Sequence, residues 1–126
     1  MKILVIGLGG FLGSVARYLF SGFAQSLSRS VSFPYGTFAV NLCGCFLIGV
    51  VSQLSETRGF LTDLSRAFIV IGILGGFTTF SAFGNESFNL LRSGETNLAL
   101  VNIFGQITCS LAGVWLGRVL AYAVWR

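Results

Sequence analysis

Four long apolar runs, separated by short connections, dominate this sequence of 126 residues. Each run approaches or exceeds the ~20 residues that a helix needs to cross about 30 Å of hydrocarbon. Only 10% of the residues are charged, and most of these lie in the connections, whereas a soluble domain usually carries about 25%. We therefore predict one all-α integral membrane domain over residues 1–126, with transmembrane helices at about 3–23, 36–54, 67–91 and 98–124.

The first run has two other interpretations, as a signal peptide or as a nucleotide-binding turn. Arg17 interrupts the run and no small-residue cleavage site follows, so we expect a helix of the mature protein. A dinucleotide fold needs an acidic residue about 20 positions after its glycines, but none precedes Glu56. The spacing of four between Gly9 and Gly13 is typical of closely packed membrane helices instead.

The third run contains the segment GILGGFTTFSAFGNE at residues 72–86, which is a poor helix interior. Glycine costs about 1 kcal/mol relative to alanine in a helix, and here Gly75 and Gly76 are followed by Thr78 and Thr79. Unwound backbone at membrane depth is tolerated only where protein or water satisfies it. We therefore predict that the third helix is broken at its centre. Its freed carbonyls suit a cation, and the start of the following half-helix suits an anion.

Two phenylalanines follow this predicted break. Phe80 and Phe83 are three residues apart, so they are neighbours on one face of a helix. A phenyl ring has a positive edge, and two converging edges make a weak anion site without a fixed charge. Ordinary packing is the alternative interpretation, and the spacing alone does not distinguish the two.

Polar side chains lie inside the second and fourth runs. Burial of the Asn41 amide without a partner costs several kcal/mol, so we expect either a hydrogen bond between helices or donation to an anion in a wet cavity. Asn102, Gln106 and Ser110 form a stripe at steps of four, which Val114 interrupts, and such stripes line pathways or join helices. The centres of the runs contain no carboxylate and the chain has no histidine, the groups that intramembrane proton transfer normally uses.

Cysteines and basic residues bear on metal binding and on orientation. The three cysteines lie inside runs, and Cys43 and Cys45 would point about 200° apart on a helix, so we interpret them, with Cys109, as packing residues. We expect no zinc site. Basic residues divide five to three between the two sides, a weak bias by the positive-inside rule that permits insertion in both orientations. The first group is Lys2, Arg58, Arg66, Arg118 and Arg126, and the second is Arg17, Arg29 and Arg92.

Three segments resemble the signatures of the Fluc (CrcB) family of fluoride channels. They are GGFTTFSAF followed by Glu86, GTFAVNLCG in the second run and GGFLGSVARY in the first. The resemblance covers all four runs. The family commonly has threonine or serine where this chain has Ala82, which removes one hydroxyl from a polar track, and Val114 is a second candidate for such a loss.

The resemblance implies an antiparallel, dual-topology homodimer in the bacterial plasma membrane, with two fluoride pores and passive fluoride export. It also implies a structural sodium ion, held at the dimer interface by the backbone carbonyls of Gly75 and Thr78. The fluoride pathway is then formed by Asn41, Phe80, Phe83, Ser81 and Ser110. We expect no enzymatic activity, no nucleic acid and no further protein partner.

The residue types suit fluoride for a physical reason as well. The ion is small and strongly hydrated, so a pore must replace water with donors, but fixed positive charges would bind it too tightly for release. The main alternative is a small proton-coupled multidrug exporter, which would need a membrane carboxylate that the first run lacks. A structural membrane subunit is a third possibility, but it would not require the glycine-rich interruption.

Overall fold

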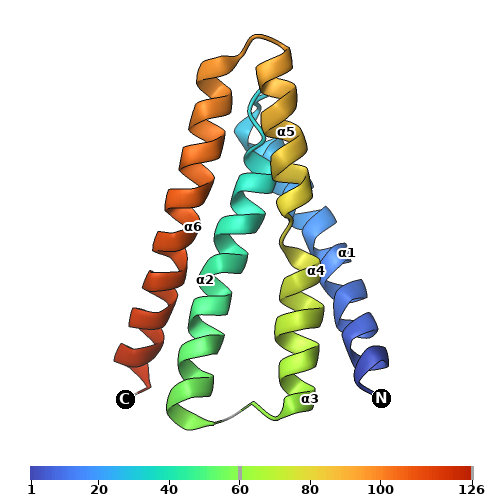
Figure 1. Ribbon diagram of the computed structural model, residues 1–126, viewed down its shortest axis with the longest axis vertical. Coiled ribbons are helices and arrows are strands. Elements are labelled where there is room, and N and C mark those ends of the chain that lie inside the picture. The colour runs from blue at the N-terminus through green and yellow to red at the C-terminus, as the bar shows by residue number, and fades with distance from the viewer. Residues whose placement is uncertain (60, 126) are drawn as a thin grey trace.

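The computed structural model describes residues 1–59 and 61–125, so Arg126 of the charge count lies outside the described part. The described chain is all-helical, and four of its helical segments are long and apolar enough to cross a membrane (Figure 1). Each of the four predicted ranges falls within one of these segments. The elements are α1 (Lys2–Ser28), α2 (Tyr35–Arg58), α3 (Asp63–Arg66), η1 (Ala67–Leu74), α4 (Gly75–Phe77), α5 (Phe80–Arg92) and α6 (Thr96–Val124).

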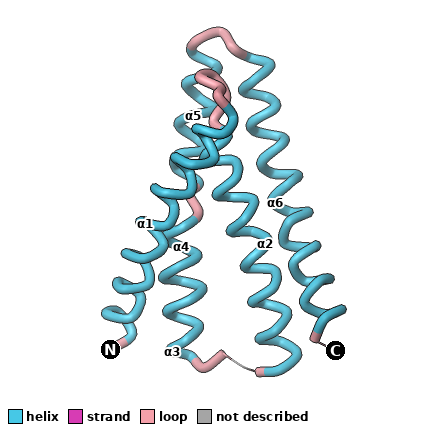
Figure 2. Tube along the Cα trace, turned by 180° about the vertical axis from the view of Figure 1, so that it is seen from behind, coloured by secondary structure: helices cyan, strands magenta, loops and turns pink. Residues whose placement is uncertain are grey.

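The chain runs up and down the long axis of the molecule. In Figure 1, α1 rises, α2 descends, the segment from α3 to α5 rises again and α6 descends. The start of α1, the end of α2, the start of α3 and the end of α6 therefore lie at one end, while the 29–34 and 93–95 connections lie at the other. The helices spread apart toward the end that holds the termini, as the view from behind also shows (Figure 2).

Glycines bring α1 against η1 and α4 in direct backbone contact. A Cβ atom added at Gly9 would lie 2.5 Å from the carbonyl oxygen of Phe68, and one added at Gly13 would collide with the carbonyl of Ile73. Real Cβ atoms do not approach other atoms so closely, so any side chain at either position would push the helices apart. The close packing predicted from the spacing of Gly9 and Gly13 is confirmed.

A second closely packed pair consists of α2 and α6. A Cβ atom at Gly49 would collide with the carbonyl of Val114, and one at Gly117 with the carbonyl of Phe46. Near the end that holds the termini, Arg118 donates two hydrogen bonds to the carboxylate of Glu56, at 2.8 and 2.9 Å. The described chain thus contains two closely packed helix pairs, α1 with η1–α4 and α2 with α6, and α5 packs against α6.

The two pairs are joined at the end opposite the termini. The side chain of Gln25, near the end of α1, donates to the carbonyls of Ser30 (2.7 Å) and Phe33 (3.1 Å) and accepts from the N–H of Gly36 at 2.9 Å. Gly36 also approaches the backbone of Ser21, since a Cβ atom there would lie 2.6 Å from the Ser21 carbonyl oxygen. One glutamine therefore fixes the 29–34 connection and the start of α2 to α1.

The helical structure of the third membrane-length segment is interrupted at two threonines rather than at its glycines. Helix α4 ends at Phe77 and α5 begins at Phe80, with Thr78 (φ −80°, ψ 159°) and Thr79 (φ −151°, ψ 117°) extended between them (Figure 2). Both glycines are helical, and Gly76 packs against α1, since a Cβ atom there would lie 2.6 Å from the carbonyl oxygen of Gly10. Residues Ala67–Leu74 form a π-helix, which was not predicted.

Threonine hydroxyls complete the two helix ends that meet here. Thr79 is the N-cap of α5, and its hydroxyl accepts a hydrogen bond from the N–H of Ala82 at 3.2 Å, the usual arrangement for this residue type. The hydroxyl of Thr78 donates back to the carbonyl of Leu74 at 3.0 Å. Thr78 and Thr79 therefore supply one side-chain hydrogen bond to the end of α4 and one to the start of α5.

Candidate functional site

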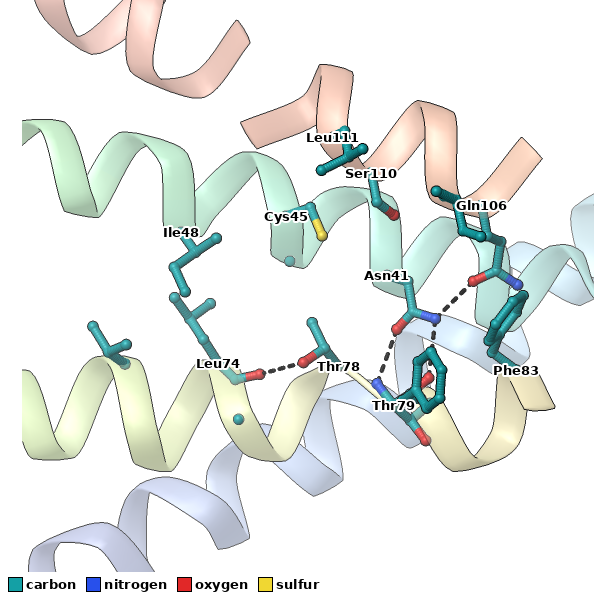
Figure 3. Close-up of a pocket in the computed structure, with 15 residues that line it drawn as sticks. Asn41, Cys45, Ile48, Leu74, Thr78, Thr79, Phe83, Gln106, Ser110 and Leu111 are labelled. Atoms are coloured by element: carbon teal, nitrogen blue, oxygen red, sulfur yellow. Dashed lines mark hydrogen bonds between the residues drawn. The ribbon is translucent and has the colours of Figure 1, made fainter. Parts of the chain in front are cut away.

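The side chain of Asn41 holds the extended backbone of Thr79 (Figure 3). Its oxygen accepts from the Thr79 N–H at 2.9 Å, and its nitrogen donates to the Thr79 carbonyl at 3.0 Å. Both polar groups of a non-helical residue are thus satisfied by one amide. Of the two roles considered for Asn41, the structure contains the hydrogen bond between segments.

This arrangement releases two carbonyls from the helical hydrogen-bond pattern. In an α-helix the N–H of Thr79 would donate to Gly75 and that of Ala82 to Thr78. Here these two N–H groups bond instead to Asn41 (2.9 Å) and to the hydroxyl of Thr79 (3.2 Å). The Thr78 carbonyl accepts a hydrogen bond from the Arg17 guanidinium of α1 at 3.3 Å. Gly75 and Thr78 are the residues that the family resemblance assigns to sodium.

A chain of amides extends from Asn41 across the bundle. The Asn41 nitrogen also donates to the Gln106 oxygen (2.7 Å), the Gln106 nitrogen to the Asn102 oxygen (2.9 Å), and the Asn102 nitrogen to the hydroxyl of Ser87 (2.9 Å). Asn102 is fully buried, and Gln106 and Ser87 are each 5% exposed. Two members of the polar stripe predicted on α6 therefore join α6 to α2 and α5.

A cavity of about 460 Å³ lies between α2, α6 and the segment that runs from η1 to α5 (Figure 3). It brings together six of the seven predicted site residues, namely Asn41, Gly75, Thr78, Phe80, Phe83 and Ser110. Gln106 lines it as well. None of the residues that line this cavity carries a charge.

The two phenylalanines differ in their surroundings. Their ring centroids lie 5.4 Å apart at an interplanar angle of 53°, which is a common geometry for aromatic pairs. Phe83 is 8% exposed and packs inside the chain, whereas Phe80 is 83% exposed. The wall of the cavity at Phe80 is therefore not covered by this single chain.

Ser81 lies in a second cavity of about 700 Å³, on the other side of Thr79. Arg17 and Glu86 line it too, and the carboxylate of Glu86 accepts a hydrogen bond from the hydroxyl of Thr37 at 2.6 Å. The second Glu86 oxygen is buried and has no hydrogen-bond partner among the described residues. Sequence reasoning missed this pair because Thr37 and Glu86 lie 49 residues apart, and no local pattern connects them.

Within residues 1–59 and 61–125, no group of three or more histidine, cysteine, aspartate or glutamate side chains could hold a metal ion. The three cysteines are free thiols of intermediate exposure. Any cation bound by these residues would thus depend on other donors, such as backbone carbonyls.

Together, the four membrane-length helices and the uncharged, mostly apolar cavity with its few amides and hydroxyls define a small multi-pass membrane protein. The chain belongs to the CrcB family: the family described as CrcB-like protein, Camphor Resistance (CrcB), matches residues 4–118. This confirms the resemblance read from the three signatures.

Curated relatives match nearly the whole chain. The fluoride-specific ion channel FluC 3 of Methanosarcina barkeri is 42% identical over 122 residues, which cover 97% of this chain and 91% of the relative. FluC 1 of Methanosarcina acetivorans is 44% identical, with 94% and 89% covered. FluC of Methylobacillus flagellatus is 40% identical, with 92% and 91% covered. These relatives are named as ion channels, so the expectation that this protein is not an enzyme is confirmed.

Proposed function

We propose that this protein is a fluoride-selective channel through which fluoride leaves the cell passively. The observation that carries the proposal is the cavity of about 460 Å³, in whose otherwise apolar wall amides, hydroxyls and two phenyl rings come together with no charged side chain. The names of the relatives, all fluoride-specific ion channels, support the same ion. A multidrug exporter finds no support in these names.

The proposed pathway uses weak, uncharged contacts. Phe80 and Phe83 would approach fluoride through their positive ring edges, and Ser110 would donate its hydroxyl from α6. Ser81 lies in the cavity on the other side of Thr79, where Arg17 would attract anions to the entrance. Thr79 lines both cavities, and Asn41 joins it by hydrogen bonds to Gln106 of α6. Such contacts replace hydration and still permit release.

The functional unit would be an antiparallel homodimer with two pores, inserted in both orientations in a bacterial plasma membrane. The exposure of Phe80, at 83%, supports this proposal because a pathway residue would need a second chain to cover it. The weak five-to-three division of basic residues supports dual insertion.

A structural sodium ion would be held at the dimer interface by the carbonyls of Gly75 and Thr78. The donor set fits, since both carbonyls lack their usual helical N–H donors and carbonyl oxygen is a suitable ligand for a hard cation. When bound, the ion would neutralise the partial negative charges that converge there. Arg17, which donates to the Thr78 carbonyl, is a competing positive group at this site.

Fluoride efflux from liposomes that contain the purified protein tests the proposal. A passive channel is expected to release fluoride only when a potassium ionophore balances the charge, and to release little chloride under the same conditions. Release that requires a proton gradient and ignores the ionophore would indicate a coupled exporter. If the protein reconstitutes as a stable assembly and releases no fluoride, the proposal is wrong.

A further inference from the structure

The amide of Asn41, which the sequence suggested as a hydrogen-bond donor to an anion, is fully used within the protein. A side-chain amide has two N–H hydrogens and one oxygen. In Asn41 the oxygen accepts from the Thr79 N–H, and the nitrogen donates to the Thr79 carbonyl and to the Gln106 oxygen. A backbone N–H can only donate and a carbonyl can only accept, so Thr79 fixes the orientation of this amide. Both Asn41 hydrogens are therefore already used.

The orientation of Gln106 follows from that of Asn41. Its oxygen must face the Asn41 nitrogen (2.7 Å), which places its nitrogen toward the Asn102 oxygen at 2.9 Å. One Gln106 hydrogen makes that bond. The second has no hydrogen-bond partner among the described residues, and Gln106 lines the uncharged cavity while Asn102 does not.

Asn102 and Ser87 reinforce the orientation that Asn41 gives to Gln106. If the Gln106 amide turned by 180°, its nitrogen would face the Asn41 nitrogen and its oxygen would face the Asn102 oxygen. Asn102 cannot turn with it unless the hydroxyl of Ser87 changes from acceptor to donor. Ser87 also follows Phe83 by four residues, so the Asn102–Ser87 bond holds the same face of α5 against α6.

We propose that Gln106 supplies the amide hydrogen that contacts fluoride in this cavity, and that Asn102 and Ser87 are the positioning residues that aim it. This inference rests on the proposed fluoride channel and refines its binding site. A buried N–H without a hydrogen-bond partner costs free energy. An anion that accepts a hydrogen bond from it removes this cost and is therefore bound. Because the amide is neutral, the contact is weak enough for release. Asn41 then contributes by holding Thr79 and Gln106 rather than by donating to the ion.

Transport by matched variants gives the first test. Gln106→Met keeps the length of the side chain and removes its donor and acceptor, and we expect fluoride flux per assembled protein to fall at least about tenfold, the weight of a hydrogen bond to a charged group. Gln53→Met is the control, because Gln53 lies on α2 and lines neither cavity. It should conduct as the wild type does.

Side-chain NMR gives a second test, in which the response is measured on the wild-type protein. The chain has three glutamines, Gln25, Gln53 and Gln106, so glutamine-specific ¹⁵N labelling yields three amide signals, of which Gln53→Met and Gln25→Met identify two. Addition of fluoride should shift the Gln106 signal of the wild type and leave the other two in place. Asn102→Leu should weaken that response, because it removes the acceptor that orients Gln106.

Each outcome decides a separate claim. Wild-type protein that carries no fluoride would overturn the proposed function. A conducting wild type in which fluoride leaves the Gln106 signal unmoved, or a Gln106→Met variant with unchanged flux, would overturn the role of Gln106 alone. An unchanged fluoride response in Asn102→Leu would overturn the positioning role of Asn102 and Ser87.

Discussion

Replacement of Asn41 by aspartate changes one atom group at the centre of the site. One carboxylate oxygen can still accept from the Thr79 N–H, which lies 2.9 Å from the present amide oxygen. The other oxygen would face the Thr79 carbonyl, which now receives a hydrogen bond at 3.0 Å. Gln106 can turn its nitrogen toward the new carboxylate, but a backbone carbonyl cannot become a donor. The substitution therefore leaves at least one part-buried acceptor unpaired.

Two effects of this change can be given magnitudes. An unsatisfied buried acceptor costs about 1–3 kcal/mol of folding free energy, which the two glycine-packed helix pairs should tolerate. A carboxylate about 5 Å from a passing fluoride ion, at an effective dielectric constant of about 20, repels it by about 3 kcal/mol. That energy lowers the flux roughly 200-fold. We expect assembled but almost non-conducting protein.

Fluoride efflux from liposomes, normalised to the assembled fraction on a sizing column, is the assay. Asn97→Asp is the matched control, since the same change is made at an exposed position in the first turn of α6, where a negative charge is favourable. An Asn41→Asp variant that assembles and conducts within about threefold of the wild type, a difference below about 0.7 kcal/mol, would refute this reasoning.

Three further predictions concern the rings, the cation and the orientation. Phe80→Leu and Phe83→Leu should assemble but lose much of their fluoride flux, because an aliphatic group has no positive edge, and methionine at either position should restore part of it; efflux per assembled dimer measures this. Protein purified without sodium should lose dimer stability or flux, because the carbonyls of Gly75 and Thr78 would no longer be held together by the ion. Sizing chromatography and fluoride efflux, compared with matched sodium buffer, measure this. Tags on the C-terminus should be found on both faces of the membrane in comparable amounts, measured by protease or labelling access in intact cells.

The opposite results are equally specific. Leucine variants with wild-type flux at both positions would show that Phe80 and Phe83 only pack. Unchanged dimer and flux in rigorously sodium-free buffer would count against the cation. A C-terminus found more than about nine-tenths on one side would exclude dual topology, since a charge bias sufficient to orient the chain would then operate.

The parts of the structure that depend on local sequence were predictable, and those that join distant residues were not. The length and apolar character of each run predict the four membrane-length helices, and the spacing of Gly9 and Gly13 predicts a closely packed helix but not that the third segment is its partner. By contrast, Asn41 and Thr79 lie 38 residues apart, and Asn41 and Gln106 lie 65 apart. A polar residue in an apolar run indicates that it has a hydrogen-bond partner, but it does not indicate which residue that partner is.

The position of the interruption shows the same limit. Glycine propensity placed the weak point at Gly75 and Gly76, but Gly76 is helical because its missing side chain admits the backbone of α1. The interruption lies instead where side chains can satisfy the extended backbone, at Thr78 and Thr79. Propensity describes an isolated helix, whereas the neighbours of a packed helix decide where it ends.

The Gln25 junction has a consequence for how the cavity responds to the surrounding lipid. The two helix pairs are joined near the 29–34 connection and, further along, by the Asn41–Thr79 and Asn102–Ser87 hydrogen bonds, and they spread toward the opposite end (Figure 1), so the joined end can act as a hinge. The cavity lies between the pairs and is lined by α2 and α6 on one side and the η1–α5 segment on the other. A thinner or thicker bilayer changes helix tilt at a cost of fractions of a kcal/mol per Å. Rotation about the joined end would widen or narrow the part of the cavity lined by Ile48, Val70 and Leu111, beyond the Asn41–Thr79 contact, without separating either glycine-packed pair. We therefore expect fluoride flux to vary with acyl-chain length in vesicles, and deletion of the hinge contacts by Gln25→Leu to make that dependence steeper.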